Sequence, residues 1–269
     1  MSGAALAGAP DQEADKEQGR DFVTALARGL SVMRAFTEQD QDLTLADIAR
    51  RVELSRATVR RSLLTLEALG YVQSSGPFFR LAPQVLTLAQ AYLSSSVLPR
   101  VAQPFLERTS EALGDSCSAS VLHGEDVIYV ARSTRKRAGS LHRDVGTHLP
   151  AYCTSMGRVL LANLPEGELD RFFRTARLEQ VTPFTLHTEE ALRAALDKVR
   201  REGFCTVDQE LEIDLRSLAV PIRNAAGRIV ASLNVSTQAR RTTSEELLGT
   251  YRLALEEAAA GMRPLLIGS

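Results

Sequence analysis

Residues 45–69 read LADIARRVELSRATVRRSLLTLEAL and contain two short helical patterns separated by a tight corner. Apolar residues recur at helical spacing on both sides of the corner, at Leu45, Ile48, Ala49 and Val52, then at Val59, Leu63, Leu66 and Leu69. Leu54 fills the corner. Ser55 is placed to cap the second helix, because its hydroxyl can accept a free backbone N–H. The spacing predicts a helix-turn-helix.

The second helix of this pair carries a concentrated positive charge. Between Arg50 and Arg61 the chain has five arginines and one glutamate, whereas its net charge as a whole is −1. Residues outside the apolar stripe lie on the first turns of this helix, where a recognition helix meets the DNA major groove. We therefore expect DNA contacts from Arg56, Ala57, Thr58, Arg60 and Arg61. The alternative is a structural helix pair with a solvated arginine face. Glu53 also departs from the motif, because glycine would adopt a left-handed corner more easily.

The flanking residues predict a winged form of this motif. Residues 22–36 have helical apolar spacing, and two β-prone runs around the turn 74–77 predict a hairpin. Arg80 on this hairpin is a candidate phosphate contact. We expect a winged helix-turn-helix DNA-binding domain over residues 22–82, and a disordered leader over residues 1–21, which are rich in Ala, Gly, Asp, Glu and Gln.

Composition favours a reduced, cytoplasmic protein. No stretch approaches the roughly 18 apolar residues that a membrane span needs. The three cysteines, Cys117, Cys153 and Cys205, lie far apart and have no zinc-site spacing, so we expect them to be small buried hydrophobes. A chain of 269 residues can bury two modest cores.

The rest of the chain predicts a linker helix over residues 83–97 and a second domain over residues 98–269. Helical patterns are expected at 101–113, 155–164, 166–175, 189–202 and 245–262. Strand patterns are expected at 116–122, 127–132, 141–145, 204–208, 217–222 and 229–236. Hairpin-linked strands interrupted by helices indicate an antiparallel sheet with helices packed on it, so the fold class is α+β.

Several of these stretches together resemble the IclR family of bacterial transcription regulators, from about Phe22 to the C-terminus. They are ARGLSV at 27–32, LSRATVRR at 54–61, the run 66–72 and LPAYCTSMGRVLLA at 149–162. The resemblance implies a winged helix joined by a helix to an effector-binding domain of GAF-like topology. It also implies a homodimer or a dimer of dimers on a palindromic operator in double-stranded DNA. RNA polymerase is a further candidate partner, and no catalytic residue, cofactor, metal or membrane is implied.

Two segments, 152–162 and 209–217, resemble the branch of this family that controls aromatic-acid breakdown through the β-ketoadipate pathway. This resemblance implies a small carboxylate effector such as protocatechuate or β-ketoadipate. Such an effector would change the packing of the second domain, and the linker helix would alter the spacing of two recognition helices.

The pocket can be read in part from chemistry. A helix starting near Thr154 or Ser155 would offer the backbone N–H groups of Ser155, Met156 and Gly157 to a carboxylate, although such a residue can also simply cap its own helix. The resemblance adds Leu141 and Leu149 as apolar walls, with polar contacts from Asp208, Ser217, Asn234 and Ser236. Arg143 and His148 flank the segment and are further candidates. The alternating acids at 208, 210, 212 and 214 would repel an anion, so part of this run should face solvent.

The competing class is an enzyme in which Cys153 is a nucleophile beside His148, since a Cys–His pair has suitable chemistry. No third orienting residue stands at a recognisable position, and an enzyme would have no use for residues 22–81. A regulator that senses oxidants through Cys153 is a second alternative.

Overall fold

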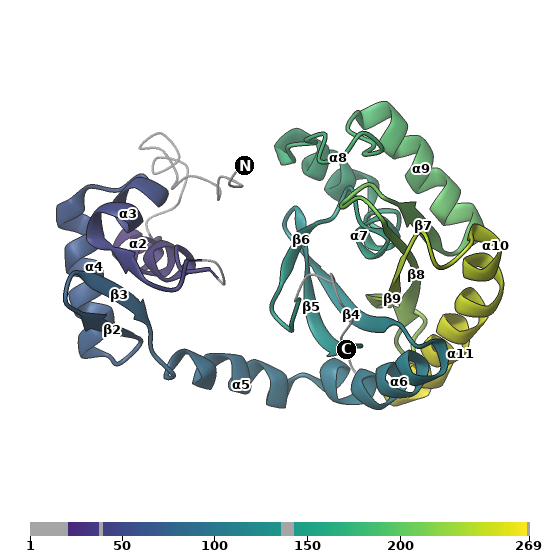
Figure 1. Cartoon of the computed structure of the whole chain (residues 1–269), viewed down its shortest axis with the longest axis horizontal. Helices are drawn as coiled ribbons and strands as arrows, with labels where there is room; N and C mark the ends of the chain where they lie inside the picture. The colour runs from purple at the N-terminus through teal and green to yellow at the C-terminus, as the bar shows by residue number, and fades with distance from the viewer. Residues whose placement is uncertain (1–20, 38–39, 136–142, 268–269) are drawn as a thin grey trace. The chain divides into compact units, whose positions relative to one another are not determined.

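The computed structural model describes residues 21–37, 40–135 and 143–267. The chain divides between Tyr92 and Leu93 into two compact units (Figure 1). This division lies inside helix α5 (Val85–Ser95), a few residues before the start predicted for the second domain. Helix α6 (Val97–Leu113) follows at once and begins earlier than predicted, because Pro99 lies in its first turn, where a backbone N–H is not needed.

The first unit is the predicted winged helix-turn-helix. Its helices are α2 (Thr24–Arg34), α3 (Leu45–Arg51) and α4 (Arg56–Ala68). The predicted hairpin forms from β2 (Val72–Ser75) and β3 (Phe78–Leu81). The two-residue strand β1 (Leu43–Thr44) was not predicted, because it is too short to show alternation; it pairs with β3, so the sheet order is β1-β3-β2. The core of this unit includes Val32, Ile48, Val59 and Leu63, all fully buried.

Local hydrogen bonds fix both ends of the helix-turn-helix corner. The hydroxyl of Ser55 accepts the backbone N–H of Thr58 at 3.2 Å, which confirms the predicted cap. Glu53 has a φ of 53°, so this residue does adopt the left-handed backbone that glycine favours. The N–H of Leu54 then returns to the carbonyl of Ala49 at 3.2 Å. The corner is therefore tight despite its glutamate.

The second unit is built on one antiparallel sheet in the order β6-β5-β4-β9-β8-β7. Its strands are β4 (Ser116–His123), β5 (Asp126–Ser133), β6 (His148–Pro150), β7 (Cys205–Asp208), β8 (Leu215–Arg223) and β9 (Ile229–Gln238). Its helices after α6 are α7 (Ser155–Leu161), α8 (Glu166–Thr175), α9 (Glu189–Glu202), α10 (Ser244–Glu246) and α11 (Arg252–Met262), with a π-helical turn at Leu247–Tyr251. The α+β class is confirmed.

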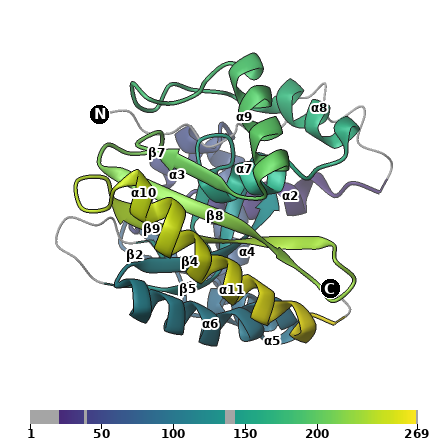
Figure 2. The ribbon, with the colours of Figure 1, turned by 90° about the vertical axis from the view of Figure 1, so that its right-hand side faces the viewer.

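Strand alternation gives the two faces of this sheet different chemistry. On β9, Ala231, Leu233 and Val235 join the core beneath α6 and α11. The intervening Asn234 and Ser236 line a pocket on the opposite face, where α7, α8 and α9 form a second core with the sheet. Figure 2 shows α6 and α11 along one face and α7 and α9 on the other. Every second residue of β9 therefore faces the pocket side.

Two predicted elements differ in the structure. A strand at 141–145 is wrong over its described part, because Val145 and Gly146 form a turn in which Gly146 has a φ of 90°. The edge strand β6 follows this turn instead and pairs with β5. The predicted closing helix 245–262 is interrupted by the π-helical turn. Within the described residues, no helix is long and apolar enough to span a membrane.

Candidate DNA-binding helix and ligand pocket

The outer face of α4 presents three unneutralised guanidinium groups. Arg56, Arg60 and Arg61 are exposed, and none of them has an ion-pair partner within the described part of the chain. Ala57 is also exposed, whereas Thr58 is half-buried and its hydroxyl lies 2.9 Å from that of Ser55. The structure therefore leaves this face free to contact an anion such as a DNA phosphate or the acceptor edge of a base.

Nearby arginines are already paired. Arg50 contacts Asp47, and Arg51 lies 2.8 Å from Asp40. Arg80 on β3 lies 2.7 Å from Asp42, and both side chains are about half-exposed. A phosphate contact by Arg80 would have to compete with this aspartate, which makes it a weaker candidate than the α4 arginines.

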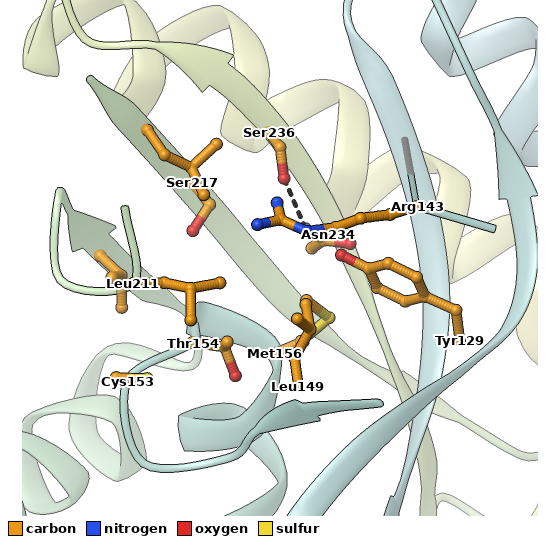
Figure 3. A pocket seen from close by; sticks show the side chains of 12 residues that line it. Tyr129, Arg143, Leu149, Cys153, Thr154, Met156, Leu211, Ser217, Asn234 and Ser236 are labelled. Atoms are coloured by element: carbon orange, nitrogen blue, oxygen red, sulfur yellow. Dashed lines mark hydrogen bonds between the residues drawn. The ribbon is translucent and has the colours of Figure 1, made fainter. Parts of the chain in front are cut away.

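The pocket of the second unit lies between the sheet and the start of α7 (Figure 3). The cavity has a volume of about 10 Å³, enough for about one water. A small aromatic acid could enter only if lining side chains moved. The lining residues are Tyr129, Arg143, Leu149, Cys153, Thr154, Met156, Val207, Leu211, Leu215, Ser217, Asn234 and Ser236.

The sheet supplies the polar floor of this pocket. Ser217 on β8 and Ser236 on β9 lie directly opposite each other in the strand register. The side-chain amide of Asn234 donates to the Ser236 hydroxyl at 3.1 Å. The amide oxygen of Asn234 is buried and has no hydrogen-bond partner among the described residues. A ligand hydroxyl could satisfy this acceptor and remove the cost of leaving it unpaired.

Arg143 supplies the positive charge of the pocket. Figure 3 shows its guanidinium reaching into the pocket toward Asn234 and Ser236. Its side chain is 14 % exposed and donates to the carboxylate of Glu212 at 2.9 Å. The pocket therefore contains a largely buried cation whose counter-ion comes from the chain itself.

At the start of α7, one of the three expected N–H groups already has an acceptor within the chain. Thr154 caps the helix and accepts the N–H of Gly157 at 3.2 Å. A Cβ at Gly157 would lie 2.1 Å from the carbonyl oxygen of Ala151, so this glycine permits packing against its own chain. Ser155 and Gly157 do not line the pocket, although the side chain of Met156 does. The structure thus assigns Gly157 to local packing and its N–H to the cap of α7, and a carboxylate contact at this helix start stays a prediction.

The remaining sequence candidates separate into two groups. Leu149, Ser217, Asn234 and Ser236 line the pocket as expected. Asp208 and His148 do not, because Asp208 pairs with Arg216 at 2.7 Å and the ring of His148 lies 3.6 Å from Asp126. Leu141 lies outside the described residues. Tyr129 also lines the pocket and was not predicted. Strand alternation could have identified it, because it shares a face of β5 with Val127.

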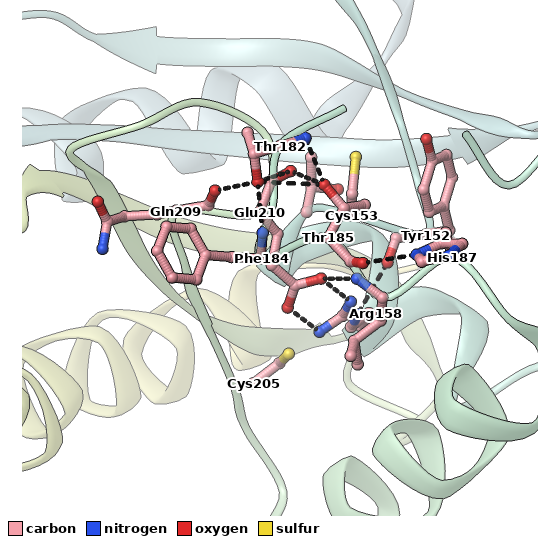
Figure 4. A network of polar contacts seen from close by, with 12 residues as sticks. Tyr152, Cys153, Arg158, Thr182, Phe184, Thr185, His187, Cys205, Gln209 and Glu210 are labelled. Carbon is pink, nitrogen blue, oxygen red and sulfur yellow. Dashed lines mark hydrogen bonds and ion pairs between the residues drawn. The ribbon is translucent and has the colours of Figure 1, made fainter. Parts of the chain in front are cut away.

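A buried ion pair beside the pocket was also missed (Figure 4). Arg158 of α7 donates to Glu210 from both terminal guanidinium nitrogens, and its Nη1 lies 2.6 Å from Oε1. Glu210 also accepts the backbone N–H of Leu186 at 2.9 Å, and Arg158 donates to the Tyr152 carbonyl at 2.8 Å. Thr182 and Thr185 donate to the Glu210 carbonyl. The sequence could have indicated this ion pair, because Arg158 stands inside the otherwise apolar run 156–162 and a buried arginine needs an acidic partner.

The geometry does not support a Cys153–His148 pair. Burial raises the pKa of the Cys153 thiol to about 12, and this thiol points at the Pro150 carbonyl, 3.9 Å away. His148 is exposed, and its ring meets Asp126 and His123. Burial likewise raises the pKa of Cys205 to about 12. A protonated, enclosed thiol is a poor nucleophile and a poor oxidant sensor.

Comparison with known proteins places these two units in one family. The model of the IclR helix-turn-helix domain matches residues 25–76, and that of the bacterial transcriptional regulator IclR C-terminal domain matches residues 90–262. The chain belongs to the IclR family. This IclR-family chain is 50 % identical over 228 residues to the Pca regulon regulatory protein of Pseudomonas putida, covering 84 % of this chain and 78 % of that one.

Two further relatives concern aromatic acids. The p-hydroxybenzoate hydroxylase transcriptional activator of Acinetobacter baylyi is 34 % identical over 251 residues, covering 91 % of this chain and 93 % of that one. The crystal structure of an IclR homolog from Microbacterium hydrocarbonoxydans, complexed with 4-hydroxybenzoate, is 27 % identical with a TM-score of 0.76, covering 91 % of this chain and 100 % of that one. The names of the Pseudomonas and Acinetobacter relatives describe regulators of gene expression, which agrees with the helix-turn-helix of this chain.

Proposed function

We propose that this IclR-family chain regulates genes of aromatic-acid catabolism in the cytoplasm. In this proposal α4 binds a palindromic operator, and the second unit binds a small carboxylate such as protocatechuate or β-ketoadipate. The names of the Pseudomonas and Acinetobacter relatives support the pathway. The observation that carries the proposal is the exposed arginine face of α4 in a chain whose second unit encloses Arg143 within a pocket.

The pocket chemistry suits a hydroxylated carboxylate. Arg143 can pair with a carboxylate, and the unpaired oxygen of Asn234 can accept a hydrogen bond from a hydroxyl. Leu149, Met156 and Leu211 supply apolar walls. An anionic end, an apolar middle and a hydrogen-bond donor are the features of a hydroxybenzoate.

Two copies of the chain are needed for a palindrome. Helix α5 has no buried residue, and Leu86, Leu88 and Tyr92 on it are 68 %, 53 % and 49 % exposed. We infer that this apolar surface packs against a second copy, giving a homodimer or a dimer of dimers. Effector binding would repack the second unit and, through α5, change the spacing of the two recognition helices, with RNA polymerase as a candidate further partner.

Operator binding tests the first half of the proposal. Arg56→Ala and Arg60→Ala should each weaken binding of the operator by about 1–3 kcal/mol where a base contact is lost. Arg174→Ala, which removes an exposed charge from α8, is the matched control and should leave binding unchanged. An electrophoretic shift assay at fixed salt measures all three. Unchanged affinity in both α4 variants would contradict the assignment.

Effector binding tests the second half. Protocatechuate or β-ketoadipate at millimolar concentration should raise the melting temperature of the full chain, because a ligand that binds the native state stabilises it. Arg143→Ala should reduce this shift, since the carboxylate loses its counter-ion. No shift with either compound would exclude this effector class.

A further inference from the structure

The segment 208–214 carries four acids, and each of them is paired with an arginine. Asp208 pairs with Arg216, Glu210 with Arg158, Glu212 with Arg143 and Asp214 with Arg240. Among these four arginines, Arg143 lines the pocket. Glu212 therefore occupies the one arginine of this set that an incoming carboxylate would need.

The contact between Glu212 and Arg143 is well placed to break. The two side chains lie 2.9 Å apart, with Arg143 14 % and Glu212 36 % exposed. The glutamate thus has solvent on one side, whereas the arginine faces the pocket. If the pair opens, the carboxylate of Glu212 can be hydrated while the guanidinium stays enclosed and needs another anion.

The backbone of this loop is held in place by hydrogen bonds and an ion pair. Glu210 is held by the buried pair with Arg158. At the other end, the Asp214 N–H donates to the Gln209 side chain at 3.1 Å, and Asp214 accepts the N–H of Arg240 at 3.0 Å. Gln209 and Asp214 have φ values of 62° and 67°, so the backbone turns at both ends. Between the anchors, the Leu215 N–H donates to the Glu212 carbonyl at 3.2 Å, so the Glu212 side chain can rotate away from Arg143 while its backbone stays in place.

The pocket also has to enlarge before a ligand can enter. Leu211 lines the pocket beside Glu212, whereas Ile213 is 55 % exposed. The open volume of about 10 Å³ is far smaller than an aromatic acid. Leu211 packs against the core formed by α7, α8 and α9, so rotation of the Glu212 side chain frees the cation, and space for a ligand has to come from rearrangement of the lining side chains.

We propose that Glu212 is an internal competitor for the effector: its carboxylate holds Arg143 in the ligand-free protein, and the effector carboxylate displaces it. This inference rests on the proposed function of the same pocket. The exchange replaces one carboxylate by another on the same guanidinium, so no additional charge is buried. While Glu212 holds Arg143, the effector carboxylate cannot pair with it. The apparent association constant for the effector is therefore the intrinsic constant multiplied by the fraction of time that Arg143 is free.

The test is Glu212→Gln in the full chain, which keeps the shape of the side chain and removes its charge. Protocatechuate and β-ketoadipate should bind about five- to tenfold more tightly to this variant than to the wild type, measured by isothermal titration calorimetry. Asp197→Asn is the control for loss of one negative charge, because Asp197 forms a more exposed pair with Arg200 at 2.6 Å on α9, and neither residue lines the pocket. It removes the same charge and should leave the affinity unchanged.

A double variant separates competition from a general change in charge. In an Arg143→Ala background, Glu212→Gln should no longer increase affinity, because there is no guanidinium left to release. If the wild type binds the effector and Glu212→Gln binds it equally well or more weakly, the inference is overturned and the proposed function stays intact. Equal gains with Glu212→Gln and Asp197→Asn would also overturn it. If neither compound binds the wild type or Glu212→Gln, both ideas fail. Should Glu212→Gln not fold, Glu212→Ala provides the same comparison.

Discussion

Glu210→Gln should destabilise the second unit strongly. The side chains of Arg158 and Glu210 are 3 % and 9 % exposed, so the substitution leaves a buried guanidinium without its counter-ion. The carboxamide can still accept one hydrogen bond, but it offers one acceptor oxygen where the carboxylate serves Nη1, Nη2 and the Leu186 N–H. Breaking a buried pair from one side costs about 3–5 kcal/mol. This is a large share of the roughly 5–15 kcal/mol that a domain of this kind has.

Urea unfolding, followed by labelling of thiols, measures the loss in the unit concerned, because Cys117, Cys153 and Cys205 all lie in the second unit and are buried. Asp208→Asn is the matched control, since Asp208 is 48 % exposed in its pair with Arg216 and should cost no more than about 1 kcal/mol. Similar small losses for both variants would refute the reasoning. Such a result would mean that solvent reaches Arg158 and replaces its partner.

Other substitutions probe packing, backbone and burial. Gly157→Ala should lower the unfolding free energy by about 1–3 kcal/mol or more, because the added Cβ meets the Ala151 carbonyl oxygen at 2.1 Å. Gly167→Ala in α8 should instead raise the unfolding free energy by about 0.5–1 kcal/mol, because the added Cβ meets no other part of the chain within 4 Å. Urea titration measures both glycine variants. Glu53→Gly should stabilise the first unit by about 0.5 kcal/mol, because the relief of the positive φ outweighs the entropic cost of ordering a glycine. A lower melting temperature would contradict this. At pH 8 a thiol reagent should leave folded Cys153 unmodified, because its pKa of about 12 keeps about one thiol in ten thousand ionised. Rapid labelling of the native chain would show that the thiol is accessible.

Periodicity was sufficient for most elements of the fold. Helices with sustained apolar spacing, such as α8 and α9, have the predicted bounds, because one buried stripe on a helix is visible in the sequence itself. Short edge strands were missed or misplaced. β6 has three residues, and its position depends on the turn at Gly146 and on pairing with β5. A local pattern does not contain that pairing.

The candidate site divides in the same way. The family resemblance named Ser217, Asn234 and Ser236 as polar contacts, and the structure brings them to the pocket, where Asn234 and Ser236 share one face of β9 by alternation. Asp208 was expected beside them, but its side chain lies outside the pocket and pairs with Arg216. Its neighbour Val207 lines the pocket instead, because successive side chains of a β-strand point to opposite faces of the sheet.

The sequence by itself determined the winged helix-turn-helix, the α+β class and the arginine face of α4, because caps and apolar spacing act between neighbours in the chain. Tertiary structure decided which charge meets which. Arg158 contacts Glu210 and Arg143 contacts Glu212 across long stretches of chain, and these pairings determine which cation is locked in the core and which one a ligand can claim. The physical reason is that the strength of an ion pair depends on burial and distance, and the fold fixes both quantities.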